Sequence, residues 1–254
     1  MAKKGKPRPT KPKMDFATRV RNIVNGEAET KEKVVNIFNQ SSVVGTGLVL
    51  TGTPTGLYQS NVLDTLAIAQ GTEQEQRNGN KISDARLRVR GVIQSLPWDT
   101  TTNNNLLPYE VHMVAFKEKK NITNTPSGLK QLPNNITGDV DGTLINSCYP
   151  YNKDSFIFRK IKTFKLRPIA GEYATAVAGN ELINTQTSNA PMFIRFHETL
   201  DIHKDLKYQD ASTIPSNDWI GVAFFVINGD GATMSATTAR CKVTMDAVLR
   251  YKDI

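Results

Sequence analysis

From residue 41 onward, short apolar runs alternate with clusters of Gly, Pro, Asn and Ser. The runs are rich in Val, Ile, Thr, Phe and Tyr, and several alternate apolar with polar residues, which is the period of a half-buried strand. No long helical pattern interrupts them, so the order favours a sandwich of two antiparallel sheets over an alternating β-α-β fold. The predicted strands are residues 56–63, 82–95, 109–116, 156–166, 192–203, 206–208, 219–227 and 240–251.

The segment 82–95 shows the alternation most clearly. One face carries Ala85, Leu87, Val89, Gly91 and Ile93, and we assign that face to the sandwich core. The other face carries three arginines at every second position, and these are too polar to be buried without partners. They are Arg86, Arg88 and Arg90.

The N-terminal part has a different pattern. Residues 15–25 place four apolar side chains on one helical face, which predicts a short amphipathic helix capped by Asp15. The pattern allows the helix to resume over residues 27–38. We therefore divide the chain into residues 1–40, a basic arm with its helix, and residues 41–254, the β domain.

Charge is distributed unevenly along the chain. The net charge is +8, and the first 21 residues hold eight cations against Asp15 alone, so they carry +7 and the other 233 residues carry +1. Prolines alternate with cations in residues 1–13, which predicts a disordered arm suited to phosphate contacts. The predicted nucleic-acid-binding residues are Lys3, Lys4, Lys6, Arg8, Lys11, Lys13, Arg19 and Arg21.

No catalytic or metal-binding motif is evident. His197 and His203 are six residues apart in a predicted strand, which separates them by about 20 Å, too far to share an ion. His112 stands apart from both, and Cys148 and Cys241 lack ligand spacing, so both are read as reduced packing residues. We predict no enzyme activity and no cofactor. No apolar run approaches 18 residues, so no membrane span is predicted.

The loop before the arginine-bearing segment and the segment itself share a set of spaced residues: Gln70, Gly71, Gln76, Arg77, Gly79, Ile82, Leu87, Val89 and Gly91. This pattern resembles the single-jelly-roll capsid proteins of small circular single-stranded DNA viruses that encode a replication initiator. It is also similar to the capsids of necrosis-virus satellites. Segments 156–166 and 221–253 resemble later strands of that family, in the same order.

The resemblance implies an eight-stranded antiparallel jelly roll, in which the loop leads from the second strand to the third. It also implies a coat protein that assembles with copies of itself into an icosahedral shell and packages a single-stranded genome through the arm, with DNA favoured over RNA. The protein would then reside in the virion, and the arm is also compatible with import into the host nucleus. A host receptor is not identifiable.

Two alternatives stay open. One is a cellular β-sandwich that binds single-stranded nucleic acid without assembling, and the other is a jelly-roll enzyme or sugar binder. For the arginines of segment 82–95, ion pairing on the sheet surface or with a neighbouring subunit ranks ahead of genome contact. The reason is that acidic residues nearly balance the cations outside the arm.

Overall fold

The computed structural model describes the chain in nine segments of strand and loop and in several single residues. The single residues are 103, 105, 151 and 153, and also 15, 16, 18 and 20 in the segment expected to be helical, where Phe16, Thr18 and Val20 have helical conformation. The described segments are residues 28–44, 48–50, 66–97, 107–118, 156–168, 190–210, 212–218, 220–234 and 238–253, and the eight arm cations lie outside them.

The described residues form an all-β fold with strands β1 to β9. Their bounds are β1 (Glu29–Val44), β2 (Leu48–Leu50), β3 (Lys81–Ser95), β4 (Tyr109–Glu118), β5 (Phe156–Leu166), β6 (Phe193–Leu200), β7 (Leu206–Lys207), β8 (Gly221–Asn228) and β9 (Ala239–Asp253).

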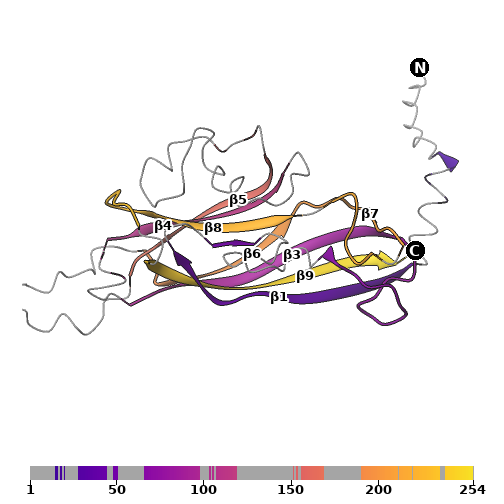
Figure 1. The fold of residues 1–254 in the computed structure, drawn as a ribbon, viewed down its shortest axis with the longest axis horizontal. Coiled ribbons are helices and arrows are strands. Elements are labelled where there is room, and N and C mark those ends of the chain that lie inside the picture. Colours follow the sequence, from indigo (N-terminus) through magenta and orange to yellow (C-terminus); the bar gives the residue numbers. More distant parts are fainter. Residues whose placement is uncertain are drawn as a thin grey trace, which may run out of the picture.

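The strands form two antiparallel sheets that lie one over the other (Figure 1). Sheet A has the order β1-β9-β3-β6, with β7 paired to the start of β3, and sheet B has the order β2-β8-β4-β5. Early strands pair with late ones on either side of the β4–β5 connection: β4 with β5, β3 with β6, β2 with β8 and β1 with β9. A long antiparallel hairpin rolled into two sheets has this order, so the predicted jelly roll is confirmed.

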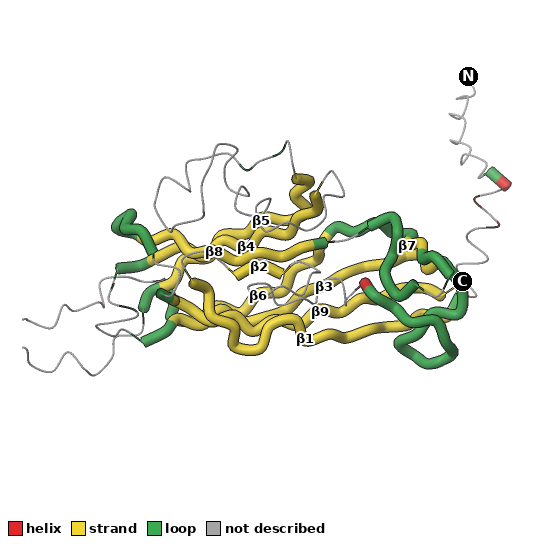
Figure 2. Tube along the Cα trace, viewed as in Figure 1, coloured by secondary structure: helices red, strands yellow, loops and turns green. Residues whose placement is uncertain are grey.

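The core lies between the inner faces of the two sheets. Phe224 of β8 contacts Phe38 of β1 and Phe196 of β6, with ring centroids 5.7 and 6.0 Å apart. Phe164 of β5 contacts Phe196 at 5.6 Å, so a row of four rings joins both sheets. Figure 2 shows the described loops gathered at the two ends of the sandwich.

Most strand predictions outside the N-terminal part are confirmed to within a few residues. The predicted strand 56–63 lies outside the described residues, and the short strand β2 was not predicted. The prediction that the helix resumes over residues 27–38 is wrong, because residues 29–38 belong to β1, which pairs with β9. Lys31 and Lys33 occupy inward positions at the start of β1, so charged residues conceal the alternation that would have indicated a strand.

A β-bulge at Asp84 determines which residues of β3 face the core. Ser83 pairs with Lys252 and Arg86 with Arg250, so two residues of β3 oppose the single residue between them on β9. Asp84 has a φ of 49°, in the left-handed region. The extra residue switches the inward positions from even numbers (Ile82) to odd numbers, and the arginines therefore face outward.

We expect the bulge to be sensitive to the residue at position 84. Asp84→Val places a β-branched side chain at a positive φ and should lower the free energy of unfolding by about 1–2 kcal/mol. Asp84→Asn, which tolerates that conformation and removes the same charge, should lower it by less. Urea unfolding of both variants measures the difference, and equal losses would show that charge rather than backbone conformation matters at this position.

The outer face of sheet B carries a second apolar cluster. Strand β8 is buried on both faces, which explains why its sequence is a continuous apolar run rather than an alternation. His112 of β4 lies in this region and stacks on Phe225 with ring centroids 4.9 Å apart. The residues of the cluster are Val114, Phe116, Phe156, Ala223, Phe225 and Ile227, with Tyr151 and Phe158 packed against them.

The environment of His112 predicts acid sensitivity. Burial lowers the pKa of His112, and the nearby Glu110 carboxylate, 3.3 Å from Nε2, only partly opposes this shift. The unfolded state therefore binds the proton more readily, so stability is fully present above the usual pKa of about 6.5 and falls as the pH drops below it. His112→Gln should flatten this part of the curve of unfolding free energy against pH. An unchanged slope would show that His112 does not titrate on unfolding.

Candidate functional site on the outer face of sheet A

The predicted nucleic-acid-binding residues of the arm cannot be placed. Lys3, Lys4, Lys6, Arg8, Lys11, Lys13, Arg19 and Arg21 all lie outside the described residues. The structure does place the arginines of β3, and with them a larger set of charges on the outer face of sheet A.

Strand register brings cations from three strands onto this face. Arg86 is directly opposite Arg250, and Val92 is opposite Arg195, so β3, β9 and β6 all contribute. On β1, β6, β9 and the part of β3 from Asp84 onward, seven outward cations stand against three carboxylates, Glu32, Asp84 and Asp246, which is a net charge of +4 with histidine counted as neutral. We call these seven cations the cationic face: Arg86, Arg88, Arg90, Arg195, Lys242, Arg250 and Lys252.

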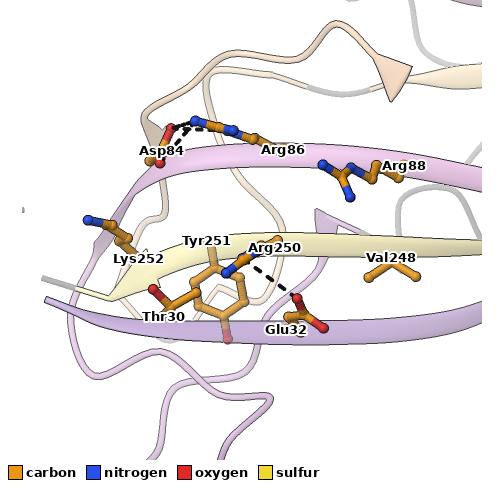
Figure 3. Close-up of a pocket in the computed structure, with 9 residues that line it drawn as sticks. All are labelled: Thr30, Glu32, Asp84, Arg86, Arg88, Val248, Arg250, Tyr251 and Lys252. Atoms are coloured by element: carbon orange, nitrogen blue, oxygen red, sulfur yellow. Dashed lines mark hydrogen bonds and ion pairs between the residues drawn. The ribbon is translucent and has the colours of Figure 1, made fainter. Parts of the chain in front are cut away.

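Three of these cations form ion pairs within the chain. Arg86 lies 3.1 Å from Asp84, and Arg250 lies 3.6 Å from Glu32, as the dashed lines in Figure 3 show. Arg90 lies 3.9 Å from Asp246. The sheet-surface pairing expected for Arg86 and Arg90 is therefore confirmed.

These pairs are weak and leave the cations accessible. The side chains of Arg86, Arg90 and Arg250 are 60%, 64% and 57% exposed. Exposed pairs of this kind stabilise a fold by at most about 1 kcal/mol and are screened by salt. The pairs therefore do not commit these guanidinium groups, which can still bind an external anion.

A pocket of about 240 Å³ opens on this face between β1, β9 and β3. Its lining includes Arg88, for which the described residues provide no ion pair, and Figure 3 shows its guanidinium beside the pocket without a dashed contact. Arg195 and Lys242 likewise have no carboxylate partner among the described residues. This surface therefore has more positive charge than the carboxylates in the described part of the chain neutralise.

Sheet B differs in this respect. Lys117 and Arg159 both contact the buried carboxylate of Asp218, at 2.8 and 3.2 Å. Lys160 and Lys162 contact Glu198, whose pKa these lysines lower, and Lys165 contacts Glu110. Each described lysine and arginine of β4 and β5 thus has a carboxylate partner, and the uncompensated charge is concentrated on sheet A.

The loop before β3 is held by a buried arginine. Arg77 is fully buried, and its guanidinium donates to the carbonyl oxygens of Ile68 and Gly79 and, at 2.8 Å, of Ser212. It also lies over the ring of Tyr208, 4.5 Å from the centroid. Five donors in a rigid planar group suit this task, which a lysine cannot perform.

The other residues that match the capsid-family motif support the same loop. Gln70 donates to the Asn78 carbonyl oxygen, and the Gln76 side chain bonds to Glu73. A Cβ at Gly71 would lie 1.8 Å from Gln76 Oε1, so a larger residue here would displace the Gln76 side chain from its contact with Glu73. Sequence reasoning identified the motif without recognising that Arg77 holds it together.

A buried ion pair ties this loop to the first and last strands of sheet A, β1 and β9. Lys31 of β1 and Asp253 of β9 are 2.9 Å apart, and each side chain is 1% exposed. Lys31 also donates to the Gln76 carbonyl oxygen at 3.0 Å, and Asp253 accepts from the Asn78 backbone N–H at 2.9 Å. Such a pair is costly to break because each partner would leave a buried charge behind.

We expect Arg77→Lys to destabilise the fold strongly. The substitution leaves several buried carbonyl oxygens without donors, at about 1–3 kcal/mol for each group, so a loss of at least about 2 kcal/mol is expected. The control is Arg86→Lys, an exposed arginine on β3, which should change the free energy of unfolding by less than about 0.5 kcal/mol. Urea unfolding of both variants provides the comparison, and similar losses would contradict a clamping role for Arg77.

The remaining sequence candidates do not converge on a site. No group of three or more metal-ligating side chains occurs in the described part of the chain. His203 follows β6, and its backbone N–H donates to Asp218. Cys241 is buried and unpaired, and burial raises the pKa of its thiol to about 12. Among the helical residues that the structure describes, none belongs to a helix long and apolar enough to cross a membrane.

Comparison with known proteins identifies no family. No family model matches the chain, and no curated protein matches it either. A solved structure titled "Desmodium yellow mottle tymovirus" is similar to all of this chain and 91% of its own, with 10% identity and a TM-score of 0.34. A TM-score this low does not establish a shared fold, so the jelly-roll assignment rests on the strand order alone.

Proposed function

We propose that this protein is a viral coat protein that assembles with copies of itself into a small icosahedral shell around a single-stranded genome. We favour DNA over RNA as the genome, because the loop-and-strand motif resembles capsids of circular single-stranded DNA viruses. The observation that carries the proposal is the jelly-roll strand order in a chain whose first 21 residues hold +7 of the net charge.

The division between arm and β domain suits these two tasks. The arm's eight cations can each neutralise a phosphate, and such contacts are strong at low salt and independent of sequence. The arm holds no aromatic residue before Phe16, so base stacking contributes little there. The clamped loop and the buried ion pair hold one end of the β domain rigidly, which suits a shell because its contacts must repeat identically around closed symmetry.

Assembly is the first test of this proposal. We expect the purified protein to form megadalton particles near neutral pH, measured by size-exclusion chromatography with negative-stain microscopy. A protein that stays monomeric both with and without single-stranded DNA would instead support the cellular nucleic-acid-binding alternative.

The arm is tested by deleting residues 1–21. Eight phosphate contacts on a single strand predict a dependence of log affinity on log salt with a slope of about −5 to −6, and the deletion should remove most of it. The β domain should stay folded, because its described contacts do not involve these residues. Packaged nucleic acid is measured by the absorbance ratio of purified particles, and unchanged packaging would show that the arm is not the packaging element.

A further inference from the structure

The cationic face keeps like charges side by side. Arg86 and Arg250 are direct cross-strand neighbours, and like charges placed opposite each other on a sheet repel and destabilise it. Arg88 follows Arg86 on the same side of β3, and neither Arg88 nor Arg195 has a carboxylate partner among the described residues. A surface with this arrangement becomes more stable when an external anion binds it.

We propose that the outer face of sheet A is a second binding surface for single-stranded nucleic acid, separate from the arm. The inference rests on the proposed function, and it assigns to the β domain a share of the genome contact. In this arrangement the phosphates follow the line of arginines along β3 and continue to Arg195 on β6.

The geometry fits an extended single strand. Residues two apart on a strand are separated by about 6.8 Å, so Arg86, Arg88 and Arg90 present cations at close to the spacing of successive phosphates in an extended chain. Their guanidinium groups can bind phosphate oxygens in a bidentate manner. The pocket beside Arg88 gives one phosphate a position between β3 and β9.

An aromatic side chain lies where this line ends. Phe193 of β6 is opposite Gln94 on the same face, two residues from Arg195, and it is 56% exposed. An exposed aromatic ring beside cations is the combination by which proteins stack bases while holding the phosphate backbone. A sulfated polysaccharide has no base to stack, and a second copy of this chain would require a matching acidic surface. Phe193 therefore favours nucleic acid.

The test compares two charge-matched double variants of the full chain. Arg88→Gln with Arg195→Gln removes two unpaired cations from the cationic face, and the control Lys153→Gln with Lys165→Gln removes two exposed cations elsewhere. Binding of a 20-nucleotide oligothymidine is measured by fluorescence anisotropy over a potassium chloride series. The first variant should reduce the magnitude of the salt slope by about 1.4, and the control should leave it unchanged.

Phe193→Ala supplies a readout that charge alone cannot give. It should weaken oligothymidine binding roughly tenfold at every salt concentration without changing the salt slope, because stacking releases no counterions.

Equal salt slopes for the two double variants would overturn the proposal. If the Arg88→Gln, Arg195→Gln variant lost heparin binding but kept oligothymidine binding, the face would be a polysaccharide site instead. If that variant no longer formed particles while its salt slope for oligothymidine was unchanged, the face would be a contact between subunits. If the unmodified protein formed no particles, the proposed coat-protein function itself would be wrong, and this outcome is distinct from a change in salt slope.

Discussion

The placement of β3 depends on the buried guanidinium of Arg77. This group fixes the backbone on both sides of the loop, at Ile68 and Gly79, and joins it to Ser212 in a segment far away in sequence. Strand β3 begins two residues after Gly79. It lies in the middle of sheet A, with β9 on one side and β7 and β6 on the other. The bulge at Asp84 then determines which side chains face the core, and so which face receives the arginines.

At the opposite end of the sandwich, a second buried arginine also donates to backbone carbonyl oxygens. Arg240 is 1% exposed, lies 4.6 Å from the centroid of the Tyr109 ring, and donates to the carbonyl oxygens of Asn105 and Leu107. Loops at the ends of a β-sandwich carry backbone carbonyl groups that strand pairing does not satisfy. A buried arginine over a tyrosine satisfies several of them at once. Each end of the sandwich is therefore fixed by its own guanidinium group.

Much of this fold could be predicted from the sequence because the central and late strands alternate or form continuous apolar runs. The fold class and the two faces of β3 follow from such patterns, whereas the place of the loop before β3 was inferred only from the resemblance to capsid proteins. Strand β1 could not be predicted, since Lys31 and Lys33 occupy its inward positions and the partner of Lys31, Asp253, lies at the far end of the chain. A pattern within one segment contains no information about a partner more than 200 residues away.

Net charge was an incomplete guide to the candidate site, because it too does not show which charged residues meet in the folded chain. The +1 carried by residues 22–254 suggested that acidic residues balance the arginines of β3. In the folded chain, several of those carboxylates pair with cations of sheet B: Glu198 of β6 and Asp218 each contact two lysines or arginines of β4 and β5. Charges that cancel along the sequence are therefore separated in space, and a nearly neutral body presents a cationic surface on the described part of sheet A. At ordinary ionic strength the screening length is about 8–10 Å, so a bound anion responds to this local surplus rather than to the total charge of the protein.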